Sequence, residues 1–235
     1  MLETVLMNGA DGLGIALPTG AVGSFRAYHD FLYEKNSVMD LTAVAPEDDA
    51  AKMHFLDSLA LLPYIPDGAA VCDIGSGAGF PGLPIRLAKP DVKLTLIDAN
   101  GKRTGFLSEL CPICGAEDTA VITGRAEELS LKPELRDSFD VCVSRAVARL
   151  NMLCELCLPF VKEGGVFLAM KAGACQEELE EAGRAISVLN AHLEPVVTYP
   201  IYGTDLTRTL IRIRKDGPTP KGYPRRFAKI KAKPL

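Results

Sequence analysis

The sequence predicts an α/β fold in which helices cover both faces of a mostly parallel sheet. From residue 69 onward, short runs rich in β-branched residues alternate with helical stretches, and this alternation is typical of doubly wound sheets. A glycine-rich segment follows the first expected strand and enters a helix, which is where such folds bind ligands. With 48% hydrophobic and 24% charged residues, the chain has the composition of a globular protein rather than a disordered one.

The expected strands share short apolar, β-branched runs bounded by turn residues. They begin near residue 69 and continue at 93–98, 119–123, 140–144, 165–171, 195–200 and 207–214. Helical patterns lie between them, near 81–88, 102–110, 149–161 and 175–191. A short loop at Gly203 joins the last two strands, so these two are expected to be antiparallel.

Two helical patterns precede the sheet, one over 21–35 and one that starts with an acidic turn at 47 and ends near Pro63. We therefore expect a helical N-terminal cap over 1–68, a ligand-binding domain over 69–215 and a basic C-terminal tail over 216–235. Positions 201–235 contain ten Lys and Arg against two Asp, although the whole chain has a net charge of −4. This asymmetry suggests a polyanionic partner, with a solvated tail as the alternative.

Several classes of protein are disfavoured by the same sequence. No apolar run is long enough for a membrane span, and the N-terminus lacks the basic region of a secretory signal. The odd number of seven cysteines argues against a disulfide scaffold and for the cytoplasm. Two Cys-x-x-Cys pairs, at 111/114 and 154/157, raise zinc binding and redox chemistry as alternatives, but 39 residues separate them and the second lies in an amphipathic helix. We expect no metal.

The glycine-rich segment reads DIGSGAGFPG over residues 73–82. Its glycines also fit a dinucleotide fingerprint, so an NAD-dependent oxidoreductase is an alternative. The Asp73 carboxylate distinguishes the two, because it would repel a pyrophosphate but suits the sulfonium and ammonium of S-adenosylmethionine. A strand-end aspartate that caps the loop is the structural alternative. Asp98, at the end of the next strand, is placed to accept the ribose hydroxyls.

Several ordered blocks extend this pattern. They are NSVMDLTA (36–43), HFLDSL (54–59), DIGSGAGFPGLPI (from 73), LIDANGKRTGFL (96–107), GRAEEL (124–129), SRAVA (144–148), Lys-x-Gly at 171–173 and the ending YPRRFAKIKAKPL. Together they resemble the RsmG (GidB) family of bacterial 16S ribosomal RNA guanine-N7 methyltransferases. Departures from the family pattern occur at Lys35, Asp40, Ala228 and Ile230.

The resemblance implies a Rossmann-like class I methyltransferase fold, S-adenosylmethionine as cofactor, and transfer of its methyl group to N7 of one guanine in 16S rRNA. The residues it implies or supports at the cofactor are Asp73, Gly75, Ser76, Gly77, Gly79, Phe80, Asp98, Ala126, Glu127 and Arg145. Arg145 is also expected to position the guanine, and no general base is expected because N7 already carries a lone pair. A noncatalytic RNA-binding protein is the remaining alternative.

A second set of residues is expected to contact RNA or to support the site. It comprises Asn36, His54, Asp57, Lys102, Arg103, Lys171, Arg225 and Arg226. Basic residues of the tail would add phosphate contacts that weaken with salt. The expected partner is 16S rRNA or the small ribosomal subunit, with the protein acting as a monomer.

Overall fold

The protein is described by a computed structural model. It describes residues 1–39, 47–145, 148–173 and 175–235, and the side chains of residues 37 and 38 are not described. Asp40 and parts of two blocks, 40–43 and 146–147, lie outside the described residues.

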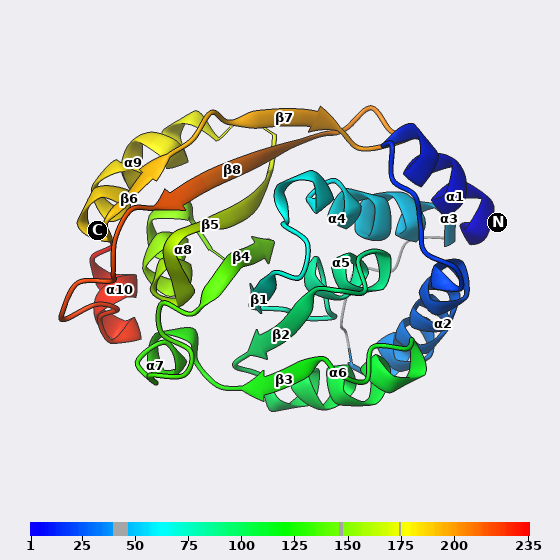
Figure 1. Cartoon of the computed structure of the whole chain (residues 1–235), viewed down its shortest axis with the longest axis horizontal. Helices are drawn as coiled ribbons and strands as arrows, with labels where there is room; N and C mark the ends of the chain where they lie inside the picture. The colour runs from blue at the N-terminus through cyan, green and yellow to red at the C-terminus, as the bar shows by residue number, and fades with distance from the viewer. Residues whose placement is uncertain (40–46, 146–147, 174) are drawn as a thin grey trace.

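An eight-stranded sheet forms the centre of the described molecule (Figure 1). Five parallel strands lie in the order β3-β2-β1-β4-β5. Their bounds are β1 Ala70–Ile74, β2 Lys93–Asp98, β3 Ala120–Thr123, β4 Phe139–Arg145 and β5 Val161–Ala172. β8 (Thr207–Lys215) pairs antiparallel with β5, and its other edge holds β7 (Val197–Pro200) and β6 (Ala191–Leu193). The mostly parallel sheet with an antiparallel C-terminal strand is confirmed, whereas β6 was not predicted.

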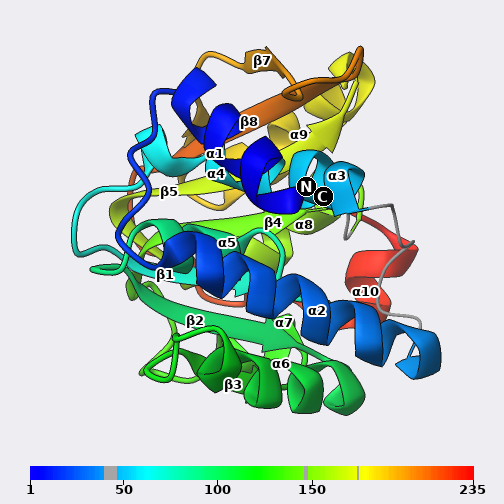
Figure 2. The same cartoon turned by 90° about the vertical axis from the view of Figure 1, so that its right-hand side faces the viewer.

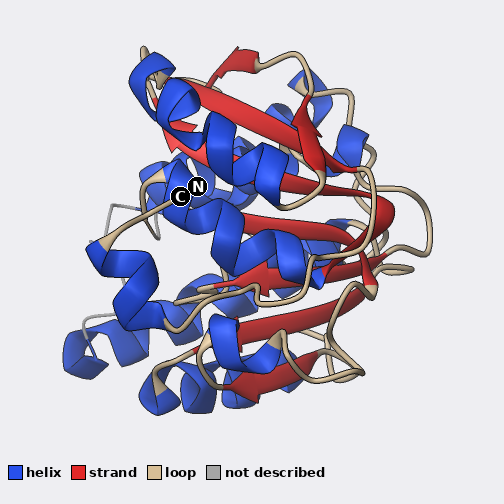
Figure 3. Ribbon diagram, turned by 90° about the vertical axis from the view of Figure 1, so that its left-hand side faces the viewer, coloured by secondary structure: helices blue, strands red, loops and turns tan. Residues whose placement is uncertain are grey.

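Residues that alternate along the central strands pack into two separate cores. Val71 and Val143 belong to one core, and Cys72 and Cys142 to the other. Because successive side chains of a strand point to opposite faces, helices must cover both sides of the sheet. The first core includes α1 (Leu2–Gly12), α2 (Ala21–Met39), α5 (Gly82–Ala88) and α6 (Gly101–Ile113), and the second includes α8 (Leu150–Cys157) and α9 (Gln176–Val188). Figure 3 shows the strands in red between these helical layers in blue.

The N-terminal region packs directly onto the first core (Figure 2). Leu2 and Leu6 of α1, a helix that was not predicted, are fully buried with Phe25 of α2. The helix predicted from 47 to Pro63 is continuous from 47 to 59, where α3 (Glu47–Ala50), a π-helical segment (Ala51–Leu56) and α4 (Asp57–Leu59) follow one another directly, and a 3-10 turn (Leu62–Tyr64) comes after it. The boundary at residue 68 therefore separates elements that share one core, and it stays a prediction.

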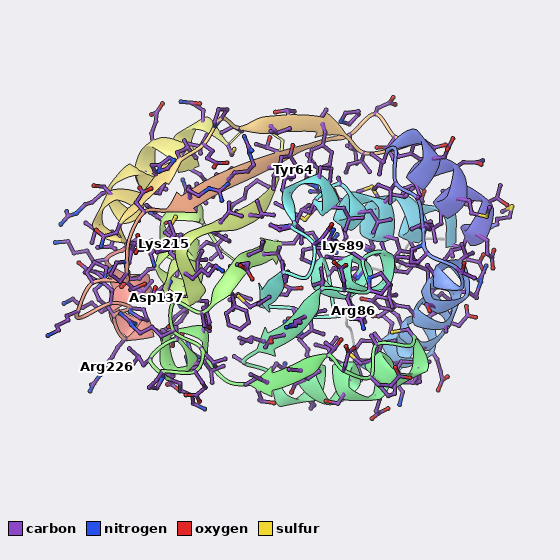
Figure 4. The ribbon with its side chains drawn as sticks, viewed as in Figure 1. Tyr64, Arg86, Lys89, Asp137, Lys215 and Arg226 are labelled. Carbon is purple, nitrogen blue, oxygen red and sulfur yellow. The ribbon has the colours of Figure 1, made fainter. Side chains whose placement is uncertain are left out.

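The C-terminal segment (216–235) also packs against the domain. Lys215, at the end of β8, is 1% exposed, and its ammonium lies 2.7 Å from Asp137 and 2.8 Å from Thr219 (Figure 4). Arg136 donates to backbone carbonyls of the segment at Thr219, Pro220 and Tyr223. The segment ends in α10 (Phe227–Ala232). These contacts make the C-terminal segment a folded part of the molecule. The alternative of a solvated tail does not describe it.

None of the described helices is both long enough and apolar enough to cross a membrane.

Candidate cofactor site

A cavity of about 450 Å³ opens at the carboxyl ends of the parallel strands. β1 lies between β2 and β4, so the strand order reverses at this point, and doubly wound sheets bind ligands at such reversals. Most residues that line it come from the segments at and after the ends of β1, β2, β3 and β4, and the helices α6, α8 and α10 contribute one residue each. The lining residues are Ile74, Gly75, Ser76, Gly77, Ala78, Phe80, Ile97, Asp98, Ala99, Arg103, Gly124, Arg125, Ala126, Glu127, Arg145, Leu156 and Phe227.

The glycine loop after β1 forms one wall of the cavity and needs its glycines for two reasons. Gly75, Gly77 and Gly79 have φ angles of 73°, 57° and 104°, a region that side chains disfavour. A Cβ on Gly79 would also lie 2.6 Å from the hydroxyl of Tyr28. That hydroxyl donates to the Ala78 carbonyl at 2.6 Å, so α2 fixes the loop from behind.

Asp73 and Gly79 were predicted at the cofactor but are not among the residues that line the cavity, and Asp73 is buried beside the lining residue Ile74. The Asp73 side chain is fully buried; Oδ2 accepts a hydrogen bond from the Gly82 amide at 2.8 Å, while Oδ1 has no hydrogen-bond partner in the described part of the chain. Burial raises the pKa of this carboxyl to about 7. A buried carboxylate with one oxygen lacking a hydrogen-bond partner is costly, and a cationic ligand would offset that cost whereas a pyrophosphate would add to it. The site therefore fits S-adenosylmethionine better than NAD.

Asp98 closes the end of β2 with its carboxylate in the cavity. Oδ2 accepts from the Gly77 amide at 2.9 Å and Oδ1 from the Asn100 amide at 2.8 Å. Each carboxylate oxygen has a second lone pair, so both remain able to accept a ligand hydroxyl. Ser76 differs, because its hydroxyl donates to the Asp73 carbonyl at 2.9 Å and accepts from the Ile97 amide at 2.9 Å. The Ser76 side chain therefore ties β1 to β2 instead of offering a free hydroxyl.

The far end of the cavity is formed where α7 (Ala126–Leu129) begins. Glu127 is 6% exposed and accepts from Arg125 Nε at 2.5 Å. Ala126 and Glu127 were predicted at the cofactor, whereas Arg125, Leu156 and Phe227 were not. No sequence pattern connects Phe227 with this loop, since it comes from the C-terminal segment.

Arg145, at the end of β4, stands over the glycine loop. Its guanidinium carbon lies 4.9 Å from the centre of the Phe80 ring, and Nη1 donates to the Met53 carbonyl at 3.2 Å. The ring of His54 stacks on Phe80 at 4.8 Å. Burial, together with the Arg145 charge, lowers the pKa of His54 to about 4, so this imidazole is neutral at pH 7.

Asp57 joins this cluster from α4 and is completely buried. Its Oδ2 lies 3.3 Å from Arg145 Nη1, and the Arg208 guanidinium binds both of its oxygens at 3.0 and 2.9 Å. The Tyr199 hydroxyl donates to Oδ1 at 3.3 Å. Arg208 and Tyr199 were not predicted, because their strands β8 and β7 approach α4 only in the folded chain.

The cations predicted to contact RNA divide into two groups. Lys102, Arg103 and Arg226 have exposed side chains. Arg103 lines the cavity with Nη1 3.8 Å from Asp98 Oδ2, and Arg226 is directed outward (Figure 4). Lys171, by contrast, lies 2.7 Å from Glu178 and donates to the Ala148 carbonyl, and Arg225 forms a two-pronged pair with the fully buried Glu155. Internal pairing disfavours RNA contact by these last two, and their assignment stays a prediction.

Asn36 and the described departures from the family pattern lie outside the residues that line the cavity. Asn36 is half-buried near the end of α2. Lys35, at one of the departures from the family pattern, pairs with Glu109 of α6 at 2.8 Å. Ile230, another departure, is fully buried in the second core, and Ala228 is exposed. The roles of these positions in RNA binding stay predictions.

The cysteines of both Cys-x-x-Cys pairs are buried thiols. Burial raises the pKa of Cys111 to about 11 and that of Cys114 to about 12, so neither is a thiolate at neutral pH. Cys154 and Cys157 are fully buried in the second core, as their helical spacing indicates. Among the described residues, no three His, Cys, Asp or Glu side chains gather in a way that could hold a metal ion.

Comparison with known proteins identifies the family. The model of the GidB family, described as rRNA small subunit methyltransferase G, matches residues 22–201, which is more than half of the chain. The chain belongs to the GidB family.

Curated relatives of this GidB protein match along its whole length. Ribosomal RNA small subunit methyltransferase G of Lachnoclostridium phytofermentans is 43% identical over 99% of this chain and 97% of the relative. The protein of the same name from Acetivibrio thermocellus is 40% identical over 100% of this chain and 97% of the relative.

Solved structures support the fold of the GidB protein. YcgJ from Bacillus subtilis superposes with a TM-score of 0.54 at 18% identity, covering 70% of this chain and 100% of that one. M. jannaschii TYW2 in complex with AdoMet gives a TM-score of 0.54 at 14% identity over 68% and 74% of the two chains. The predicted Rossmann-like methyltransferase fold is confirmed.

Proposed function

We propose that this protein transfers the methyl group of S-adenosylmethionine to N7 of a single guanine in the 16S rRNA of the small ribosomal subunit. The observation that carries the proposal is the pair of buried carboxylates at the ends of β1 and β2. Asp73, fully buried next to the lining residue Ile74, has one oxygen without a hydrogen-bond partner among the described residues, and Asp98, which lines the cavity, offers lone pairs to ligand hydroxyls. Membership of the GidB family supports ribosomal RNA as the substrate class.

The bound cofactor would supply an electrophilic methyl group on its sulfonium. Guanine N7 carries a lone pair in the plane of the base, so the chain has to orient the base and exclude water but need not remove a proton. Arg145 lines the cavity at the end of β4, and we assign this task to it because its planar donor fork suits guanine O6 or a phosphate oxygen. His54, neutral at pH 7, packs beside Phe80 and closes the same side of the site.

The RNA is proposed to approach over the exposed cations near the cavity. Lys102 and Arg103 at the start of α6 and Arg226 before α10 offer charges to phosphates on two sides of the opening. We propose that the protein acts as a monomer. A ribosomal substrate would place the protein in the cytoplasm.

The test is transfer of a labelled methyl group from S-adenosylmethionine to small ribosomal subunits that lack the modification, with the product nucleoside identified by mass. We expect 7-methylguanosine at one position of 16S rRNA. Free 16S rRNA serves as a second substrate, so that the assembled and naked forms are compared. A methylated nucleoside other than 7-methylguanosine would overturn the assignment of the base, and binding of S-adenosylhomocysteine without any transfer would overturn the substrate.

A further inference from the structure

The C-terminal helix α10 brings an aromatic ring into the cofactor cavity. Phe227, the first residue of α10, lines the cavity beside Leu156, Ala126 and Glu127. The resemblance to the GidB family implies that Ala126 and Glu127, at this end of the cavity, flank the adenine of the cofactor. Figure 1 shows α10 beside α7 and α8, far along the chain from the glycine loop. The C-terminal segment therefore completes the cavity, although the sequence analysis predicted only a basic tail there.

Buried contacts hold Phe227 in this position from both sides. Two residues before it, Arg225 binds the fully buried Glu155 of α8, with Nε and Nη2 at 2.8 and 2.6 Å from its two oxygens. Three residues after it, Ile230 is fully buried in the second core. Because these anchors flank the ring closely, its position is set by the fold and does not depend on a ligand.

The ring is further fixed by Arg125. The guanidinium carbon of Arg125 lies 4.2 Å from the centre of the Phe227 ring, and its Nε is bound to Glu127 at 2.5 Å. Arg125, Glu127 and Phe227 line the cofactor cavity and also a neighbouring cavity of about 330 Å³. They form a partition between the two cavities, and Phe227 is its aromatic part.

We propose that Phe227 is a specificity-determining residue for the cofactor, forming the surface against which the adenine base stacks while Arg125 holds the ring. The inference rests on the proposed function, since it assumes an adenosyl ligand in this cavity. A purine and a phenyl ring are both flat and polarisable, and stacking of a base on an aromatic side chain changes affinity by about tenfold or more. Phe227 takes no part in the transfer itself, so its removal should raise KM for S-adenosylmethionine and leave kcat nearly unchanged.

The first test measures ligand affinity of the full-length protein by calorimetry. In Phe227→Ala, we expect the Kd of S-adenosylhomocysteine to rise about tenfold. The Kd of 5′-methylthioadenosine should rise by the same factor, because it keeps the base but lacks the amino acid. Phe227→Trp should retain tight binding. Unchanged affinity in Phe227→Ala would overturn this inference alone, whereas failure of the unaltered protein to bind either ligand would overturn the proposed function.

The second test separates stacking from simple packing. The chain contains no tryptophan, so Phe227→Trp creates a single indole at the proposed contact. Its fluorescence should be quenched when S-adenosylhomocysteine binds. Ala228→Trp is the matched control, because Ala228 is the next residue of α10 and is exposed; its emission should not change. Phe227→Trp that binds the ligand without a change in emission, or that binds as weakly as Phe227→Ala, would overturn the proposal.

Discussion

Arg208 donates hydrogen bonds to both oxygens of the Asp57 carboxylate, from Nε to Oδ1 at 3.0 Å and from Nη2 to Oδ2 at 2.9 Å, and Arg145 Nη1 donates to the same Oδ2 at 3.3 Å. Asp57 is completely buried and lies on α4, Arg208 on β8 and Arg145 at the end of β4. One carboxylate thus ties the N-terminal region and the antiparallel strand to the residue placed over the cofactor cavity. Asp57 therefore holds Arg145 in place through contacts that neither β4 nor β8 could make without α4.

Asp57→Ala should damage both stability and activity. The substitution leaves two arginines that are 13% and 14% exposed without their shared anion, and breaking a buried ion pair from one side costs about 3 kcal/mol or more. Denaturant unfolding measures the stability and labelled-methyl transfer the activity. Lys35→Ala is the control, because it removes the exposed pair with Glu109 and should change stability by less than about 1 kcal/mol. Equal stability of the Asp57 variant and the control would contradict the role assigned to Asp57.

Arg145→Ala should abolish methyl transfer while the protein stays folded. The guanidinium is proposed to orient the base, and misplacement of a reacting group costs on the order of a hundredfold in rate. Binding of S-adenosylhomocysteine should weaken less than turnover falls, because Arg145 is one of many residues that line the cavity. Arg145→Lys should not restore activity, because an ammonium lacks the planar fork. Near-normal turnover by either variant would show that the assignment is wrong.

Asp73 predicts how cofactor affinity depends on pH. Burial raises its pKa from an ordinary value of 3.8 to about 7 in the ligand-free protein, and a cationic ligand favours the ionised carboxylate. Binding should therefore release a proton, and affinity for S-adenosylmethionine should rise between about pH 6 and pH 8. Calorimetry in buffers of different ionisation enthalpy measures the released proton. Asp73→Asn should bind more weakly and lose this pH dependence; a variant that keeps it would place the titrating group elsewhere.

The same shift has a consequence for stability without ligand. A carboxyl whose folded pKa is raised stabilises the fold below its unfolded pKa, and this contribution is lost as pH rises through the folded value. The change in the free energy of unfolding between pH 4 and pH 8 should therefore be less favourable to the fold for the ligand-free protein than for Asp73→Asn. Chemical unfolding at several pH values measures the difference. Parallel curves for the two proteins would indicate that Asp73 is ionised throughout.

The parts of the site that follow one strand could be predicted from the sequence, and the parts that cross the fold could not. Asp73 and Asp98 each end a β-branched run, and the carboxyl ends of parallel strands meet at one edge, so their proximity follows from the pattern. Arg208 and Phe227 reach the site through tertiary packing, for which the sequence carries no periodic signal. Charge in the sequence does not show which cations are paired internally: Arg225 sits in a basic run and forms an ion pair with the buried Glu155, while its role in RNA binding stays a prediction.

Exposed and internally paired cations should differ in how they affect RNA binding. Arg226 is exposed beside the cavity, so Arg226→Ala should reduce the slope of log affinity against log salt concentration by about 1, as expected when one phosphate contact is lost. Lys171 is 11% exposed and paired with Glu178, so its ammonium is not free to contact a phosphate and release counterions from the RNA. Lys171→Met should leave the slope unchanged even if the altered packing lowers affinity at every salt concentration. Filter binding of a 16S rRNA fragment across a salt series measures both slopes. A reduced slope for the Lys171 variant would mean that its pair with Glu178 opens when RNA binds.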